Sequence, residues 1–144
     1  MPPEAHIHKS VVVPGTAQDT RKVCEQILSL IRDYKYSEDD IFAIHLALEE
    51  ALINAVKHGN NMNPDKEVKV EYTIMPDKID VSVTDQGRGF NSERVPDPRL
   101  DENLYKTDGR GLFLIRAYMD EIEFNEAGNC IRMIRHKGSR SGYN

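Results

Sequence analysis

Three polar residues recur at intervals of four in the segment LALEEALINAVKHGN (46–60): Glu50, Asn54 and His58. Residues four apart lie one above the other on an α-helix, so a carboxylate, an amide and an imidazole would share one strip of its surface. A carboxylate can serve as a general base, and an amide oxygen can bind a hard cation. The other interpretation is an exposed polar edge on a helix that Gly59 ends as a C-cap.

The apolar residues around this strip favour the first interpretation. They form one helical stripe, and Leu46 and Ile53 lie roughly opposite to it, so we expect the polar strip to border a cleft. Glu49 is the other carboxylate beside the strip, but it points away from Asn54, so the geometry favours Glu50 for any role of a carboxylate. The stripe consists of Ile41, Ile44, Leu48, Ala51, Leu52 and Ala55.

The segment VSVTDQGRGF (81–90) places an acid at the end of a strand pattern. Asp85 is followed by Gly87 and Gly89, and a D-x-G-x-G sequence by itself predicts only a tight turn. With a ligand, the carboxylate would accept a hydrogen bond while the glycines let the backbone approach a flat molecule.

The segment DGRGLFLI (108–115) places Gly109 and Gly111 directly before an apolar helix. Free backbone N–H groups at a helix start can bind phosphate, and the alternative is a flexible entry to the helix. The stretch 86–109 has no regular pattern, and irregular loops longer than ~12–15 residues in compact domains are usually lids or disordered. We expect this stretch to close over a ligand.

Apolar periodicity predicts the elements that position these residues. Strand patterns occur near 7–15, 68–74, 79–83, 121–125 and 130–135, and helical patterns occur over 17–34, after the capping pair Ser37 and Asp40, and over 112–119. The order β-α-α-β-β-α-β-β, with neighbouring hairpins, predicts an α+β fold in which helices pack on one face of a mostly antiparallel mixed sheet. We expect one domain over 1–136 and a flexible tail over 137–144.

Composition narrows the class of protein. The 144 residues are 39% hydrophobic and 30% charged, which fits one ordinary core and argues against disorder. The net charge of -5 disfavours direct nucleic-acid binding. We find no membrane-spanning run and no signal-peptide pattern, and Cys24 and Cys130 form no metal-ligand pattern, so we expect a cytoplasmic protein with reduced thiols.

In chain order, E-x-x-x-N-A-x-x-H-G on a helix, D-x-G-x-G, a long loop and G-x-G-L form a combination that is much more specific than any one part. From about Ile41 to Ile134 the sequence resembles the GHKL ATPase superfamily, and within it the anti-sigma-factor serine-protein kinases. The resemblance implies the two-layer α/β sandwich of that superfamily and a site for ATP and Mg²⁺.

The resemblance also implies a role for each motif residue. Asn54 would coordinate Mg²⁺, Asp85 would accept a hydrogen bond from the adenine amino group, and Glu50 would be the general base that takes a proton from a partner's serine. For His58 a structural role near the helix end is favoured. The other implied ATP contacts are Gly87, Gly89, Lys106, Gly109, Arg110, Gly111 and Leu112, of which the lysine and the arginine fit a solvated surface equally well.

The implied activity is that of an anti-sigma factor in a partner-switching pathway. The chain would bind a sigma factor and would phosphorylate a serine of an anti-anti-sigma protein with a STAS domain, as a homodimer without direct contact to nucleic acid or membrane. The alternative is a nucleotide-gated binding module with little or no kinase activity, and the presence of Glu50 favours the kinase. An ATPase fragment of a larger machine is disfavoured because nothing else is encoded.

The chain departs from the superfamily pattern in two respects. Many members carry threonine near the adenine after the final turn, whereas Asn129 and Cys130 follow Gly128 here, which bears on nucleotide affinity. In addition, no long helix with a phospho-acceptor histidine precedes the core, so we do not expect a free-standing histidine kinase. The histidines elsewhere in the chain lie on predicted strands or helices without such a setting: His6, His8, His45 and His136.

Overall fold

The computed structural model describes residues 6–87 and 111–143. These residues form the elements in the order that the sequence predicts, with one additional π-helical turn, η1. The elements are β1 (Ile7–Pro14), α1 (Ala17–Asp33), α2 (Glu38–Asn54), η1 (Ala55–Gly59), β2 (Glu67–Ile74), β3 (Lys78–Thr84), α4 (Gly111–Tyr118), β4 (Glu121–Phe124) and β5 (Cys130–His136).

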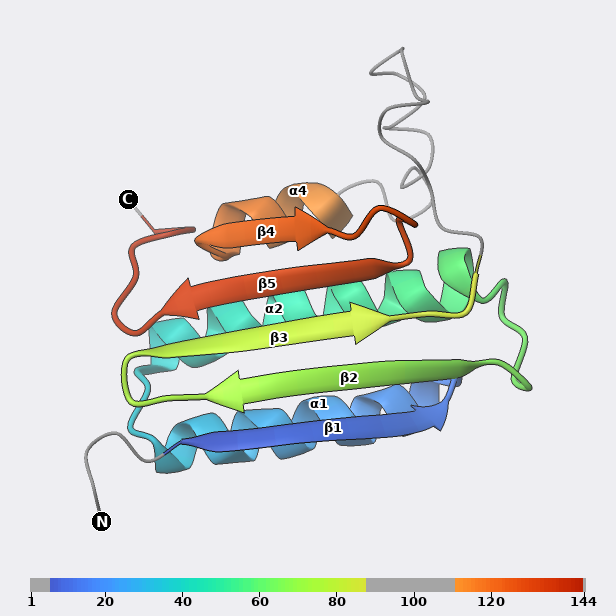
Figure 1. Ribbon diagram of the computed structural model, residues 1–144. Helices are drawn as coiled ribbons and strands as arrows, with labels where there is room; N and C mark the ends of the chain where they lie inside the picture. The colour runs from blue at the N-terminus through green and yellow to red at the C-terminus, as the bar shows by residue number, and fades with distance from the viewer. Residues whose placement is uncertain (1–5, 88–110, 144) are drawn as a thin grey trace.

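The strands form one sheet in the order β1-β2-β3-β5-β4, and helices α1, α2 and α4 cover one face of it (Figure 1). The prediction of a two-layer α+β fold is therefore confirmed. Every ladder in the described residues is antiparallel, so the sheet is not mixed. Two of these ladders, β2–β3 and β4–β5, join the strands of hairpins, which pair antiparallel.

Both long helices begin at a side-chain cap. Thr16 Oγ1 accepts a hydrogen bond from the Asp19 N–H, and Ser37 Oγ accepts one from the Asp40 N–H, each at 3.1 Å. Such caps stabilise a helix by about 1 kcal/mol. The second cap confirms the predicted start of α2. None of the helices in the described part of the chain combines the length and the apolar character needed to cross a lipid bilayer.

The apolar core lies between the helices and the covered face of the sheet. The predicted stripe of α2 is buried throughout, from 0% exposed at Leu48 to 6% at Ile41. The strand alternation is also confirmed, because β2 and β3 bury every second side chain. These buried strand residues are Val68, Val70, Tyr72, Ile74, Ile79, Val81 and Val83.

A buried ion pair joins the two layers. Arg135 on β5 and Asp40 on α2 are 0% and 1% exposed, and Arg135 Nε donates to Asp40 Oδ1 at 3.0 Å. The other guanidinium nitrogens donate to the carbonyls of Tyr118, Ser139 and Ser141. These last two residues belong to the segment for which the sequence predicts a flexible tail, and their bonds connect it to the core.

The end of α2 differs from a simple C-cap. The helix widens into η1, where the Asn60 N–H donates to the Ala55 carbonyl, five residues back, at 2.9 Å. The residues with positive φ come later, at Asn61 (52°) and Met62 (60°), and Gly59 is not among them. The interpretation of Gly59 as a routine C-cap is therefore wrong, and its role must lie elsewhere.

Candidate functional site

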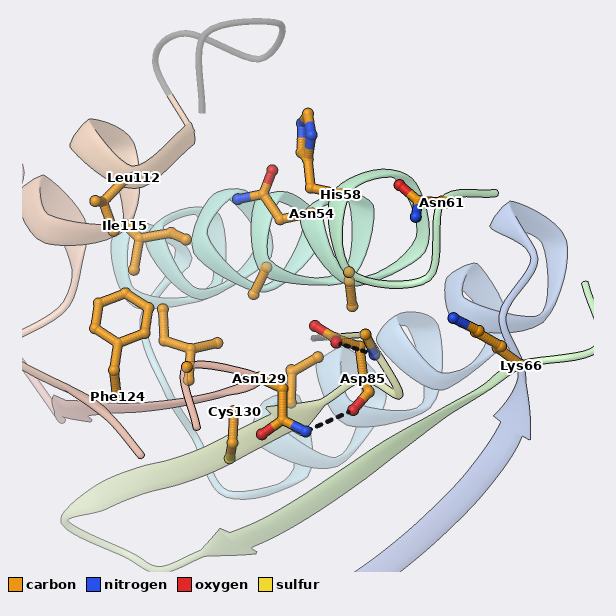
Figure 2. Close-up of a pocket in the computed structure, with 17 residues that line it drawn as sticks. Asn54, His58, Asn61, Lys66, Asp85, Leu112, Ile115, Phe124, Asn129 and Cys130 are labelled. Carbon is orange, nitrogen blue, oxygen red and sulfur yellow. Dashed lines mark hydrogen bonds between the residues drawn. The ribbon is translucent and has the colours of Figure 1, made fainter. Parts of the chain in front are cut away.

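A cavity of about 570 Å³ lies between the end of α2 with η1, the ends of β3 and β5, and α4. Figure 2 shows Asn54 and His58 on its helical wall and Asp85 and Asn129 on the opposite wall, which the sheet provides. The complete lining is Ala51, Asn54, Ala55, His58, Gly59, Asn61, Lys66, Val83, Asp85, Gly87, Leu112, Ile115, Phe124, Gly128, Asn129, Cys130 and Ile131.

Asn54 is the most informative residue of the helical wall. It is the last residue of α2, and its Oδ1 atom is buried without a hydrogen-bond partner among the described residues. A buried acceptor without a partner costs roughly 1–3 kcal/mol. This arrangement suits an acceptor whose partner arrives from outside the protein, as a cation or a hydrogen-bond donor.

Asp85 is the corresponding residue of the sheet wall. It follows β3 directly, as the sequence predicts, and its Oδ1 accepts a hydrogen bond from the Gly87 N–H at 2.8 Å. Burial raises the pKa of the Asp85 carboxyl, while the bond from Gly87 and the positive charge of Lys66 act in the opposite direction. A partly buried carboxylate in such a cavity favours a ligand that donates a hydrogen bond.

Two glycines allow the helical wall and the Asp85 turn to touch. A Cβ atom at Gly59 would overlap the Asp85 carboxyl group, and a Cβ atom at Gly87 would overlap the carbonyl oxygen of Gly59. Neither glycine has a positive φ, so close approach and not backbone conformation explains why glycine is needed. Glycine is therefore needed at position 59, directly after His58, because it allows the close contact with Asp85.

Asn129 supports the Asp85 turn from the β4–β5 hairpin. Its Nδ2 donates to the Asp85 carbonyl at 3.1 Å, and its own carbonyl accepts from the Asp85 N–H at 2.9 Å. Asn129 Oδ1 in turn accepts from Asn125 Nδ2 at 2.8 Å. Asn129 thus lines the cavity and also holds the backbone of Asp85.

The structure brings four of the residues predicted from the motifs to the cavity: Asn54, Asp85, Gly87 and Leu112. Gly111 is the first residue of α4. Glu50 is partly buried on α2, one turn before Asn54, and is not part of the lining. The other predicted contacts fall outside the described residues: Gly89, Lys106, Gly109 and Arg110.

The sequence predicts no ligand contact for several residues of the lining. Lys66 lies between η1 and β2, and only its position in the fold brings its charge near Asp85. His58 lines the cavity, although the sequence favours a structural role for it. The apolar part of the wall has the same periodicity as the core and could not be distinguished from it: Val83, Ile115, Phe124 and Ile131.

The residues present fit a cation that arrives together with a ligand. Among residues 6–87 and 111–143, no group of three or more His, Cys, Asp or Glu side chains is placed to hold a metal ion. Mg²⁺ takes most of its ligands from phosphate oxygens and water when it binds with a nucleotide, so one protein oxygen suffices. The unpaired Oδ1 of Asn54 fits that single role.

Comparison with known proteins points to the same chemistry. Residues 13–135 match the family model described as the histidine kinase-like ATPase domain. The chain is 35% identical over 108 residues to the serine-protein kinase RsbW of Listeria monocytogenes, an overlap of 70% of this chain and 69% of the relative. It is 31% identical over 108 residues to RsbW of Oceanobacillus iheyensis (70% and 68%) and 34% identical over 106 residues to RsbW of Staphylococcus aureus (68% and 67%).

Proposed function

The chain belongs to the histidine kinase-like ATPase domain family, and on that basis we propose that it is a Mg-ATP-dependent anti-sigma factor and protein serine kinase of a partner-switching pathway. It would bind a sigma factor and phosphorylate a serine of an anti-anti-sigma protein of the STAS type. One observation carries the proposal: Asn54, whose buried Oδ1 has no hydrogen-bond partner among the described residues, and Asp85 line one cavity.

The nucleotide would span these two walls. The Asp85 carboxylate would accept a hydrogen bond from the adenine amino group, and Gly87, which lines the same cavity, would lie beside the ring. The apolar side chains of Ile115 and Phe124 line the same cavity and would cover the ring. The phosphates would extend towards Asn54 and Leu112. The contacts that the resemblance implies for Gly89, Lys106, Gly109, Arg110 and Gly111 stay predictions.

Asn54 Oδ1 would hold Mg²⁺, which when bound neutralises part of the negative charge of the phosphates. This contact would also supply the partner that the buried oxygen lacks within the described protein. His58 lines the cavity one turn further along the same helical wall, where its imidazole can donate a hydrogen bond to a phosphate oxygen.

Glu50 would act as the general base. It lies one helical turn before Asn54 on α2, so the partner's serine would approach the terminal phosphate from the Glu50 side of Asn54. As the serine oxygen of the partner forms a bond to the terminal phosphorus, Glu50 would accept the hydroxyl proton. The bond between that phosphorus and the bridging oxygen breaks, and ADP leaves with the electron pair.

The second candidate is a nucleotide-gated binding module with little or no kinase activity. The observation that favours it is that Glu50 is not part of the cavity lining. A base that does not face the nucleotide directly would act only if the bound partner brings its serine to the Glu50 side of α2.

The experiment that separates the two candidates uses Glu50→Gln with Glu49→Gln as the matched control. Glu49 is the neighbouring acid, 55% exposed and 3.1 Å from His45, and has no role in the proposal. For each protein we would measure Mg-ATP affinity, phosphate transfer to a STAS partner and sigma-factor binding. Loss of an acid–base group lowers a rate by about 10²–10⁴-fold.

We expect Glu50→Gln to lose transfer on that scale while both affinities stay at the wild-type values, and Glu49→Gln to behave as wild type. Transfer at the wild-type rate by Glu50→Gln would show that Glu50 is not the base. A wild-type protein that binds Mg-ATP but phosphorylates no STAS partner would establish the binding module instead.

The proposal also includes the assembly and location that the resemblance implies. We propose a homodimer in the cytoplasm that does not bind nucleic acid directly, in keeping with the net charge of -5. Light scattering of the purified chain tests the dimer.

A further inference from the structure

Asn60 is a completely buried polar residue that the proposed chemistry does not use. Its side chain is 0% exposed. Its Oδ1 accepts a hydrogen bond from the Gln86 N–H at 2.8 Å, and its Nδ2 donates to the Glu67 carbonyl at 3.0 Å. Its backbone N–H donates to Ala55, so one residue connects η1, the start of β2 and the turn after Asp85.

These bonds form part of a closed ring. Gln86 Oε1 accepts from the Glu67 N–H at 2.7 Å, which joins the two segments that Asn60 also joins. Gly15 packs against the Asn60 side chain, because a Cβ atom at Gly15 would come within 2.9 Å of Asn60 Nδ2. The ring thus holds the residue after Asp85 against the end of the helical wall.

We propose that Asn60 is a positioning residue for nucleotide binding: it fixes the Asp85 turn relative to the helix that carries Asn54. The inference rests on the proposed function, in which these two residues hold opposite ends of the nucleotide. Asn129 holds the Asp85 backbone from the hairpin side, and Asn60 holds the next residue, Gln86, from the helical side.

The physical reason is preorganisation. Without the Asn60 side chain, the Gln86 N–H and the Glu67 carbonyl lose their partners, and the turn must become ordered when the nucleotide binds. Ordering on binding lowers affinity without removing any contact to the ligand. The affinity that is lost should be mainly the part that comes from the proposed hydrogen bond between Asp85 and the adenine amino group.

The test compares Asn60→Ala and Asn60→Asp with Asn63→Ala as the matched control. Asn63 lies in the same loop and caps the exposed Asp65 N–H at 2.9 Å, but it does not contact the Asp85 turn. The ligands are Mg-ATP and Mg-ITP, which has an oxygen in place of the adenine amino group and the same phosphates. Dissociation constants come from calorimetry, and thermal melting shows that each variant is folded.

We expect Asn60→Ala to bind Mg-ATP about tenfold more weakly than the wild type. The affinity for Mg-ITP should fall less, so the preference for Mg-ATP over Mg-ITP becomes smaller. Asn63→Ala should match the wild type for both ligands. A variant that only loosens the fold would lose affinity for both nucleotides equally, so the ATP-to-ITP ratio separates positioning from general destabilisation.

The Asn60→Asp variant tests whether lowering the pH restores the hydrogen bond and, with it, the affinity for Mg-ATP. The introduced carboxyl can still accept from the Gln86 N–H, but only its protonated form can donate to the Glu67 carbonyl. Relative to wild type at the same pH, its ATP affinity should recover as the pH falls from 8 to 6. The other titratable groups near this junction, His58, Lys66, Glu67 and Asp85, are present in both proteins, so the wild type measured at each pH is the reference.

Three results would overturn the inference. A folded Asn60→Ala with wild-type affinity and selectivity shows that Asn60 does not position the turn. Equal losses for both nucleotides, with no recovery of Asn60→Asp at low pH, show a general structural role. A wild-type protein that binds no nucleotide contradicts the proposed function itself, and the inference with it. If Asn60→Ala does not fold, the pH dependence of Asn60→Asp decides the question alone.

Discussion

Replacing Asp85 by asparagine tests the adenine contact with a change of one atom. The asparagine Oδ1 can still accept the hydrogen bond from the Gly87 N–H, which is 2.8 Å long in the structure. The backbone bonds between Asp85 and Asn129 are also kept. Only the second carboxylate oxygen changes, from an acceptor to an NH₂ donor. We therefore expect the turn to survive while the ligand-facing group changes character.

The size of the effect follows from the hydrogen bond that is lost. The adenine amino group would meet a donor in place of an acceptor, and a desolvated polar group without a partner costs roughly 1–3 kcal/mol. At 1.4 kcal/mol for each factor of ten, Asp85→Asn should weaken Mg-ATP and Mg-ADP binding by about 5- to 150-fold. Mg-ITP has a carbonyl oxygen in place of the adenine amino group, which can accept a hydrogen bond from the new amide, so its binding should weaken less or become tighter.

The pH dependence of stability separates this binding loss from unfolding. Because burial raises the pKa of the Asp85 carboxyl in the folded protein, the folded state holds a proton at pH values where the unfolded chain has released it. This group therefore stabilises the protein less as the pH rises through that window, and at pH 7 its ionised form is unfavourable. Asp85→Asn should thus be at least as stable as wild type at pH 7.

Protonation of the Asp85 carboxylate should also change the affinity for Mg-ATP. Only the ionised carboxylate offers two acceptors, so wild-type affinity for Mg-ATP should fall as the pH drops through the raised pKa of Asp85. The asparagine variant should lack this contribution.

The assay is calorimetry with Mg-ATP, Mg-ADP and Mg-ITP, together with thermal melting. Asp77→Asn is the control, because Asp77 is exposed in the turn at the other end of β3. Wild-type ATP affinity in a folded Asp85→Asn protein would refute the assignment of Asp85 to the adenine.

Four further changes test other parts of the structure. Gly59→Ala places a Cβ atom onto the carboxyl group of the facing turn, so calorimetry should show at least tenfold weaker nucleotide binding. Asn54→Ala should remove the part of ATP affinity that depends on Mg²⁺, so that titrations with and without EDTA become equal. Asp40→Asn leaves Arg135 buried without its counter-ion and should lower the free energy of unfolding by about 3–5 kcal/mol in urea. Asp80→Asn, which breaks a partly exposed pair, should cost about 1 kcal/mol or less.

Most of the fold could be predicted because its determinants are local. Strict alternation on β2 and β3, with a short turn between them, leads to the observed pairing of Val70 with Val83. The cap at Ser37 predicts the start of α2. The buried pair between Asp40 and Arg135 could not be predicted, because the two residues are 95 positions apart and Asp40 reads locally as part of a helix cap.

The candidate site also contains residues that the sequence identifies and residues that only the structure identifies. Asn54 and Asp85 carry motifs whose chemistry is readable from residue type and spacing, and the structure places both on one cavity. Asn60 and Lys66 carry no such pattern. The bond from Gln86 to Asn60 joins residues 26 positions apart, so only the packing of η1 against the turn makes the asparagine necessary.

The π-helical turn explains why glycine follows the polar strip. In an α-helix the Asn60 N–H would donate to Val56, whereas here it donates to Ala55, so the backbone between these residues is wider than in an α-helix. Each residue of such a turn rotates less about the axis, so a spacing of four no longer defines a straight column beyond Asn54. Gly59 is thereby directed at the Asp85 carboxyl, and Asn60 at Gln86 and Glu67. No local residue pattern marks this widening. The hydrogen bonds of the Asn60 side chain help to stabilise this wider helical turn. On our proposal, the separation between Asn54 and Asp85 therefore depends on a contact that is seen only in the folded chain.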